Sequence, residues 1–356
     1  MSGRQIRGRV TTCFEVPEVD VVSCHAFSRD GKLLALCPGS EEILLFRRRG
    51  GDFERAHVLA KHAQLVTGVD WSVSGRLVSV SEDRTAYVWE ATGPGGGWAA
   101  VTAVLRAPLA GLCVAWAPNG LRFAIGLSSN DTAVCHYQQD VECWVAKKVG
   151  ASKAAVTAVA WHPTSSFLAT GSTDRKVMVY DVNEAGEPPF GDAQLADDMG
   201  AWVNAVAFSP PKGRILAAVA QDSTVRFKAL AGGPESPVEV VRWKRLPFLQ
   251  ATFVSEQLLV ACGFDCMPVL FSQAGGKWHL HGILDVGPKV SSVMRSRESY
   301  EDARNLFTRS GAKEGAEDTK SVTWHTNTIT TCTAQADMRF STSALDGQVI
   351  EWEVLA

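Results

Sequence analysis

Apolar residues alternate with polar or small residues in short runs along most of the chain. The clearest stretch holds three such runs, at residues 66–71, 76–80 and 85–89, separated by turn-forming residues at 74–75 and 81–84. Alternation with a period of two, bounded by Gly, Ser and Asp, is typical of β-strands that bury one face. We therefore expect an all-β protein built from short antiparallel strands.

These runs recur with a regular period. The aromatic residues that close the first run of each unit are spaced by 44 to 47 residues, at Phe27, Trp71, Trp116, Trp161, Phe208 and Phe253. A second aromatic closes the third run and in most units follows an Asp by six residues, as in Asp83 and Trp89, Asp131 and Tyr137, Asp174 and Tyr180, Asp265 and Phe271, and Asp346 and Trp352. This period is the length of one four-stranded blade of a β-propeller.

Seven such units use nearly all of the 356 residues. The predicted fold is an all-β, seven-bladed WD-repeat β-propeller that forms a single domain over residues 1–356, because each blade packs only on its neighbours and one ring can absorb this length. The N-terminal run at about residues 10–16 is expected to supply the outer strand of blade seven. That pairing would join the two ends of the chain and cover a sheet edge.

Each recurrent Asp falls in the turn before a third strand, where its carboxylate can accept hydrogen bonds from backbone N–H groups. In blade two, His62 with Ser79 or Ser81 and Trp89 is expected to complete the side-chain network typical of WD repeats. A buried carboxylate without partners costs more than one hydrogen bond contributes, so we interpret these acids as structural rather than catalytic. The predicted structural residues are His62, Asp83, Trp89, Asp174, Tyr180, Asp222, Asp265, Phe271, Asp346 and Trp352.

Two units depart from the pattern. The sixth residue after Asp222 is Lys228 instead of an aromatic, which places Phe227 on the opposite face of its strand. Residues 181–199 form an enlarged connection rich in turn-forming residues, and we expect a surface loop there.

Residues 288–320 lie outside the repeat, between blades six and seven, and form an inserted, partly helical segment. A helix is predicted over residues 296–308, with Ser296 as its N-cap and Gly311 beyond its end. Two interpretations stay open: the segment packs on its own propeller or is disordered, or it offers the helix to a groove on a partner. In the second case the candidate contacts are Arg297, Tyr300, Arg304, Leu306 and Phe307.

Composition narrows the function classes. The net charge of −3 argues against a general nucleic-acid binder. No run of eighteen apolar residues is present, and the first ten residues lack the apolar core of a secretion signal. The chain is therefore expected in the cytoplasm without membrane insertion, with an Arg-rich transit peptide as a weaker alternative. Two basic clusters, Arg47–Arg49 and Arg242 with Lys244 and Arg245, are open to binding acidic peptides or to being a solvated rim.

The sequence contains no clear motif for binding a metal ion or a nucleotide cofactor. The nine Cys fall within strand patterns without framework spacing, which favours reduced, packed thiols. Cys262 and Cys266 with His279 and His281 form a weak metal-like set that alternation would divide between strands. The glycines at 93–97 lack the following helix of a phosphate loop. We expect no metal, no cofactor and no catalytic residues.

Several longer stretches are more specific than the repeat itself. They are Ser23-Cys-His-Ala-Phe-Ser28, Ala35-Leu-Cys-Pro-Gly39, Val66-Thr-Gly-Val-Asp-Trp71, Cys113-Val-Ala-Trp-Ala-Pro118 and Ala261-Cys-Gly-Phe-Asp-Cys-Met-Pro-Val-Leu-Phe271. With these stretches the chain resembles, over nearly its whole length, the WD-repeat subunit 1 family of the actin-related protein 2/3 complex, which nucleates branched actin filaments. That family also carries a helical insertion between its sixth and seventh blades.

The resemblance implies a non-enzymatic subunit that braces the other subunits and contacts actin through the insertion. It further implies as partners the other subunits of the complex, the actin filament and acidic nucleation-promoting peptides, at the actin cytoskeleton in the cytoplasm. The alternatives are a different WD-repeat scaffold, such as a substrate receptor of a ubiquitin ligase, and a propeller hydrolase with paired carboxylates. The hydrolase is disfavoured because the turns already use most of the recurrent acids.

Overall fold

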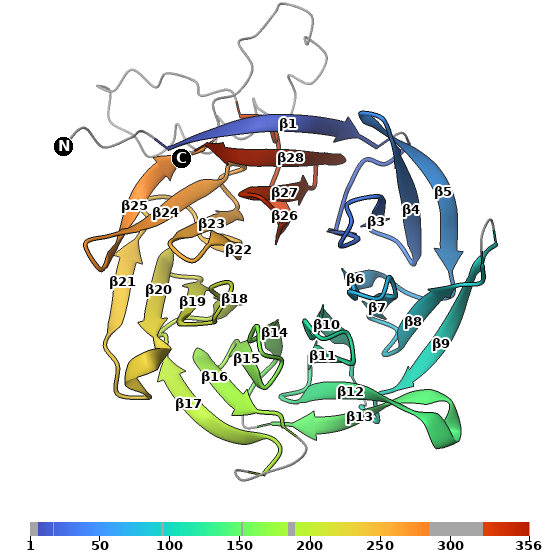
Figure 1. Ribbon diagram of the computed structural model, residues 1–356, viewed down its shortest axis with the longest axis horizontal. Helices are drawn as coiled ribbons and strands as arrows, with labels where there is room; N and C mark the ends of the chain where they lie inside the picture. Colours follow the sequence, from blue (N-terminus) through green and yellow to red (C-terminus); the bar gives the residue numbers. More distant parts are fainter. Residues whose placement is uncertain are drawn as a thin grey trace, which may run out of the picture.

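The computed structural model describes residues 6–16, 18–93, 96–107, 109–150, 152–183, 189–284 and 323–355. In these residues, antiparallel four-stranded sheets are arranged as seven blades around a central axis (Figure 1). The all-β, seven-bladed propeller predicted from the repeat is confirmed.

Within a blade the strands follow one another from the axis outward. Blades one to three comprise β2 (Cys24–Phe27), β3 (Leu33–Cys37), β4 (Glu42–Arg49) and β5 (Asp52–Ala60); β6 (Val66–Trp71), β7 (Leu77–Ser81), β8 (Ala86–Ala91) and β9 (Trp98–Val104); and β10 (Gly111–Trp116), β11 (Arg122–Leu127), β12 (Thr132–Gln138) and β13 (Cys143–Val149). Blades four and five comprise β14 (Val156–Trp161), β15 (Phe167–Ser172), β16 (Lys176–Asp181) and β17 (Asp192–Asp198); and β18 (Val203–Phe208), β19 (Ile215–Ala220), β20 (Thr224–Ala229) and β21 (Val238–Arg242).

Blades six and seven complete the ring. Blade six contains β22 (Phe248–Ser255), β23 (Leu258–Gly263), β24 (Val269–Ala274) and β25 (Lys277–Ile283), and blade seven contains β26 (Ile329–Ala334), β27 (Arg339–Ala344), β28 (Gln348–Leu355) and the N-terminal β1 (Arg7–Glu15). Two short 3-10 helices, η1 (Gln139–Val141) and η2 (Leu230–Gly232), follow third strands.

The N-terminal strand closes the ring. β1 runs antiparallel to β28 along its outer side, with Arg7 opposite Leu355 and Glu15 opposite Gln348 (Figure 1). Gly347, in the turn before β28, has a φ of +76°. A Cβ at that position would lie 2.4 Å from the carbonyl oxygen of Val19, so only glycine fits this close approach.

Neighbouring blades are joined near the axis by polar side chains of the inner strands. The hydroxyl of Thr67 donates to the carbonyl oxygen of Gly111 in the next blade at 2.7 Å. The same link to the following blade is made by Thr157 to Val203, by Asn204 to Phe248 and by Thr330 to Val22. Each link gives a backbone carbonyl of the next blade a hydrogen-bond donor, and it fixes the position of one blade against the next.

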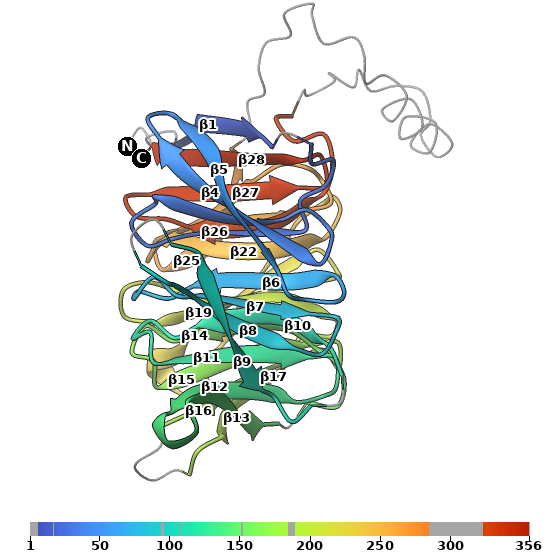
Figure 2. The same ribbon diagram turned by 90° about the vertical axis from the view of Figure 1, so that its right-hand side faces the viewer.

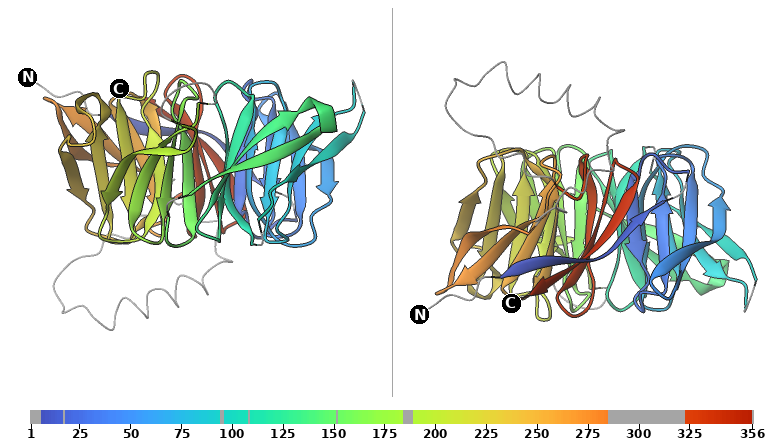
Figure 3. Two further views of the ribbon diagram at one scale, coloured as in Figure 1. Left: turned by 90° about the horizontal axis from the view of Figure 1, so that it is seen from below. Right: turned by 90° about the horizontal axis from the view of Figure 1, so that it is seen from above.

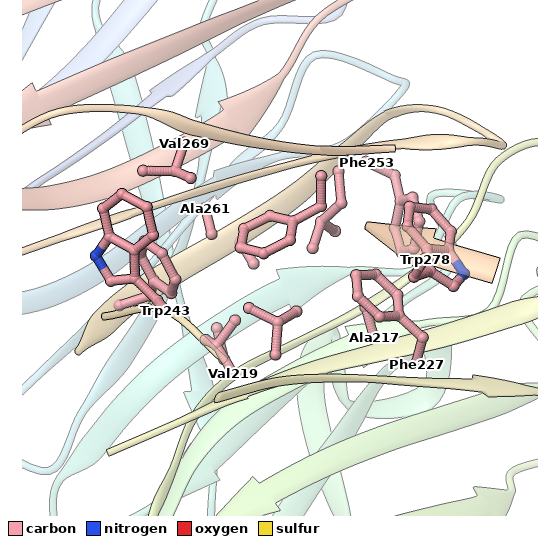
Figure 4. Packing of buried hydrophobic residues seen from close by; sticks show 14 of the residues in the cluster. Ala217, Val219, Phe227, Trp243, Phe253, Ala261, Val269 and Trp278 are labelled. Atoms are coloured by element: carbon pink, nitrogen blue, oxygen red, sulfur yellow. The ribbon is translucent and has the colours of Figure 1, made fainter. Parts of the chain in front are cut away.

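Apolar side chains fill the space between blades. Figure 4 shows the packing between blades five and six, where Phe227 stacks on Trp278 with ring centroids 4.0 Å apart and Phe253 meets Trp278 nearly edge-on. Figure 2 shows the blades packed face to face from the side. Burying large apolar side chains of this kind contributes ~1.5–3 kcal/mol each, so each blade depends on its neighbours for stability.

The ring has two faces, which Figure 3 shows edge-on. We call the face with the loops that lead into the inner strands, for example residues 243–247, the upper face. The lower face carries the loops that leave the inner strands, for example residues 28–32. No helix among the residues described here is long and apolar enough to cross a membrane.

The structure differs from the sequence-based expectation at the enlarged connection of blade four. Residues 181–199 were expected to be a surface loop, but β17 occupies Asp192–Asp198 and pairs with β16. Its Asp-rich sequence hid the strand, because only Leu195 and Asp197 turn toward the blade and the other residues are exposed. A further feature without a sequence signal is the parallel pairing of β9 with β13, which joins the outer strands of blades two and three.

Candidate functional site

The candidate partner contacts Arg297, Tyr300, Arg304, Leu306 and Phe307 lie outside the described residues, and their role stays a prediction. The propeller on either side of residues 285–322 is described, at the upper face. On the blade-six side, Leu284 is buried and its N–H donates to the carbonyl oxygen of Pro268 at 2.9 Å. On the blade-seven side, the hydroxyl of Thr323 donates to the carbonyl oxygen of His325 at 2.6 Å. Leu284 is therefore held by blade six, and Thr323 is held to His325, which is fully buried in the ring.

The blade-seven attachment lies beside a buried polar network. His325 Nδ1 is 3.1 Å from Asp346 Oδ2, and His325 Nε2 is 2.7 Å from the Thr342 hydroxyl, which also accepts the indole N–H of Trp352 at 2.8 Å. Because Thr342 accepts from Trp352, its own proton is free to go to Nε2, and Nδ1 carries the hydrogen that the Asp346 carboxylate accepts. Every member of this network thus has a partner.

Blade two repeats the same arrangement with different residues. His62 Nδ1 is 3.0 Å from Asp83 Oδ2, and its Nε2 is 2.8 Å from the Ser79 hydroxyl, which accepts the indole N–H of Trp89. Of the two serines expected here, Ser79 makes the contact, whereas Ser81 donates to the carbonyl oxygen of Gln64. The turn acids of both blades also accept backbone N–H groups, from Ala63 and Thr326 respectively.

Burial decides the direction of the pKa shift of His62, whereas hydrogen bonds and charge decide that of Asp346. Burial lowers the pKa of His62, against the opposing charge of Asp83, so the imidazole stays neutral. Burial alone would raise the pKa of Asp346, but hydrogen bonds and charge from His325 and the N–H groups of Thr326 and Gln348 hold that pKa below its ordinary value. Groups held neutral or fully bonded in this way are suited to a structural role.

The other predicted structural residues are less uniform. Asp174 accepts N–H groups from Lys153 and Lys176, and Tyr180 is buried at the end of β16. Asp222 accepts the N–H and hydroxyl of Thr224.

In blade six the acid has another kind of partner. Asp265 accepts the indole N–H of Trp243 at 2.7 Å. Phe271 is fully buried and meets Phe248 edge-on. The recurrent acids of blades two, four, five, six and seven thus all hold local structure.

Several buried polar groups had no place in the repeat pattern. Asp70 accepts the N–H of Trp116 from the next blade at 2.6 Å, and burial raises its pKa to about 7. His25 lies between blades one and seven, where its two ring nitrogens contact the hydroxyls of Ser343 and Ser341 at 2.9 and 2.8 Å, and burial lowers its pKa to about 3. The signal for Asp70 was available in the sequence: the equivalent residues in blades one, three, four and five are Ala26, Ala115, Ala160 and Ala207, and blade six has Thr252.

The described residues offer no ligand set for a metal ion. No group of three or more His, Cys, Asp and Glu side chains within them is placed to hold a metal ion. Of the weak metal-like set, Cys262 is buried beside the thiol of Cys332, whereas His279 and His281 lie exposed on β25. Burial raises the pKa of Cys113 to about 12 and that of Cys262 well above its ordinary value, which keeps these thiols protonated and unreactive.

The two basic clusters differ in how far their charges are free. Arg48 is tied inward, with its guanidinium 2.6 Å from Glu351 and 4.5 Å from the ring centroid of Phe53. Arg49 pairs with Glu54, which leaves Arg47 without an ion pair to a described residue. At the upper face, Arg242 contacts Asp222, and Lys244 has no ion pair with a described residue. Neither cluster is a continuous set of unpaired cations.

Comparison with known proteins is consistent with this geometry. The family model for the WD domain, G-beta repeat, matches residues 53–90 and 145–181. Actin-related protein 2/3 complex subunit 1A of Arabidopsis thaliana is 33% identical over 359 residues, which cover 94% of each chain. Actin-related protein 2/3 complex subunit 1A-A of Xenopus laevis is 30% identical over 94% of each chain. The subunit 1 of Schizosaccharomyces pombe is 30% identical over 92% of this chain and 95% of its own.

Proposed function

The chain belongs to the family of subunit 1 of the actin-related protein 2/3 complex, and from this premise we propose that it is a structural subunit of such a complex. In this role it holds other subunits on its rigid ring and supports the nucleation of branched actin filaments. The carrying observation is the extent of the relationship: identity of 33% is spread over 94% of both chains, so it covers all seven blades.

We further propose that residues 288–320 contact the actin filament, with Tyr300, Leu306 and Phe307 as apolar anchors and Arg297 and Arg304 as charge partners. The support is geometric. The residues that flank 285–322 are fixed to buried parts of the ring. Leu284 is bonded within blade six, and the His325 network lies in blade seven. A binding segment on a rigid base loses less conformational freedom on binding than one on a flexible tail.

The proposed role is non-enzymatic and cytoplasmic, at the actin cytoskeleton. The recurrent acids that a hydrolase would need are hydrogen-bonded to the turns and networks of their own blades. Acidic nucleation-promoting peptides are proposed as further partners, and Lys244 at the upper face is available to them.

The first experiment recovers the tagged protein from cytosolic extract of its own cells at mild salt and identifies stoichiometric companions by mass spectrometry. Two actin-related chains and four smaller subunits are expected. A chain that copurifies instead with ubiquitin-ligase components, or alone, would contradict membership of the complex.

The second experiment tests the insertion. Replacing Tyr300, Leu306 and Phe307 by Ala should weaken branching while the complex still assembles, because each buried apolar anchor contributes ~1.5–3 kcal/mol before ordering costs. The matched control is Val141→Ala, an exposed apolar residue in η1. Loss of assembly in the insertion variant would instead mean that these residues pack within the complex.

A further inference from the structure

A pocket of about 350 Å³ lies at the junction of blades one and seven. Its walls come from four parts of the chain: strand β1, the loop between β2 and β3, strand β4, and the segment from the end of β26 to β28. The lining residues that matter here are Thr12, Lys32, Arg48, Gln335, Arg339 and Glu351. Because it lies where β1 closes the ring, this junction pocket exists only in the closed propeller.

One wall of the junction pocket carries a buried carboxylate oxygen without a partner. Glu351 is 7% exposed, and its Oε1 accepts from Arg48 Nη2 at 2.6 Å and from Gln335 Nε2 at 3.4 Å. Its Oε2 is buried and has no hydrogen-bond partner among the residues that the structure describes. A buried carboxylate oxygen left unpaired is costly, and natural proteins resolve such groups with water, an ion or a ligand.

The cations of the junction pocket are not equally available. The guanidinium of Arg48 is occupied by Glu351, by the carbonyl oxygen of Gly31 and by the ring of Phe53. The ammonium of Lys32 is 3.3 Å from the exposed carboxylate of Asp30, a weak pair. Arg339 forms no ion pair or hydrogen bond through its side chain with any residue in the described part of the chain. It is therefore free to bind an anion.

Glu351, which has an oxygen without a donor, and Arg339, which has no anionic partner among the described residues, thus line the same pocket. We propose that the junction pocket binds a zwitterionic group, with a cationic nitrogen that donates to Glu351 Oε2 and a carboxylate that pairs with Arg339 and Lys32. A carboxylate readily serves two cations, one on each oxygen, so Arg48 and the ligand nitrogen do not compete. A purely anionic ligand would leave Glu351 unpaired, and a purely cationic one would face Arg48, Lys32 and Arg339.

Two sources supply this chemistry: neighbouring basic and acidic side chains of a peptide, and a free α-amino acid. The volume of about 350 Å³ holds either the side chains of two residues or one amino acid. This inference does not depend on the function proposed above, since it rests only on groups within the junction pocket.

The test measures binding to the full chain, within its complex if it assembles, by saturation-transfer NMR. The probes are N-acetyl-Lys-Glu-amide, free glutamine, and two singly charged controls, N-acetyl-lysine amide and N-acetyl-glutamate amide. The dipeptide, free glutamine or both should bind with a Kd below about 10 mM and at least about fivefold more tightly than either control. Preference for the dipeptide identifies a peptide source, and preference for free glutamine identifies a small molecule.

Two variants locate the binding. Arg339→Gln should weaken binding of the zwitterion about tenfold without affecting folding, because the residue is exposed and makes no ion pair with a described residue. The matched control is Arg29→Gln, an exposed Arg in the neighbouring loop that does not line the pocket, and it should change nothing. Glu351→Gln should weaken the zwitterion but not N-acetyl-glutamate amide.

Should Glu351→Gln fail to fold, Arg339→Gln decides alone. Absence of saturable binding for both zwitterions would overturn the proposal, and so would binding that Arg339→Gln leaves unchanged. In either case the junction pocket holds solvent, and Glu351 Oε2 is hydrated.

Discussion

Blades two and five have the same strand order but satisfy their buried polar groups in different ways. In blade two, the chain Trp89, Ser79, His62 and Asp83 forms a relay in which each hydrogen bond orients the next. In blade five, Ala218 and Met199 replace the serine and the histidine, and Lys228 replaces the tryptophan. No relay is possible with these residues, yet the strands pair in the same register.

Blade five compensates with a different set of contacts. The ammonium of Lys228, 4% exposed as a residue, binds Asp197 Oδ1 at 2.9 Å and the carbonyl oxygen of Pro234 at 2.6 Å. On the other face of β20, Phe227 stacks on Trp278 of blade six. The comparison teaches that the relay is one of several ways in which a blade can provide partners for the polar groups that it buries at these positions.

The largest effect is expected from moving the lysine of blade five into blade two. Trp89→Lys removes a buried indole and buries an ammonium that has no carboxylate beside it, unlike Lys228, which has Asp197. We therefore expect the free energy of unfolding to fall by about 4 kcal/mol or more. Chemical denaturation followed by near-UV circular dichroism measures it. Trp202→Lys, at a position 58% exposed, is the control and should cost under about 0.5 kcal/mol. Equal costs at the two positions would contradict the comparison.

A smaller loss is expected from interrupting the relay itself. His62→Ala leaves Asp83 Oδ2 with one donor fewer and the Ser79 hydroxyl without its acceptor, which should cost about 1–3 kcal/mol. Asp83→Asn should cost less after His62→Ala than before it, because the two residues share one network. A double-mutant cycle measures this coupling. Strict additivity would mean that His62 and Asp83 stabilise the blade independently.

Replacing the lysine of blade five by an apolar residue should cost less again. Lys228→Met keeps the volume and removes the ion pair, and Asp197, with a side chain 25% exposed, can be hydrated, so we expect a loss of at most about 1.5 kcal/mol. Asp197→Asn is the informative control, since it leaves the buried ammonium without a charge partner and should cost more than Lys228→Met. The reverse order would show that the ion pair is a net source of stability.

The repeat predicted most of the fold because a few residues at fixed positions in each unit, the closing aromatics and the turn Asp, mark its strands and turns. The period of the closing aromatics reports the blade length, and the Asp six residues before them reports the turn before the third strand. The outer strand β17 was missed because outer strands bury little, so their sequence need not alternate: Leu195 is the only residue of Asp192–Asp198 that is fully buried. Local patterning is informative where burial is strong.

The candidate site was predicted unevenly for a related reason. The blade-two network could be assembled from His62, Asp83 and Trp89, since these lie at fixed offsets in one unit. The Glu351 and Arg48 pair could not, because the two residues lie 303 positions apart and meet only when the ring closes. Contacts between blades depend on how the units stack, and the sequence of one unit does not record that geometry.

The smallest expected effect concerns a pH dependence that blade two has and blade five lacks. Burial raises the pKa of Asp70 to about 7, from an unfolded value of 3.8, whereas blade five has Ala207 at this position. The folded state therefore holds a proton that the unfolded state releases. Asp70 favours folding fully below pH 3.8, and this contribution is lost as the pH rises toward about 7.

Asp70→Asn keeps the shape and removes this titration. The wild type should lose about 1 kcal/mol more than the variant between pH 6 and pH 7.5, which unfolding in urea at closely spaced pH values measures. The difference between the two proteins isolates Asp70, because His25 and His62 titrate in both and shift stability in the opposite direction: burial lowers their pKa values, so they favour the folded state as the pH rises. Identical pH profiles would mean that Asp70 is ionised in the folded protein, held by the N–H groups of Trp71 and Trp116.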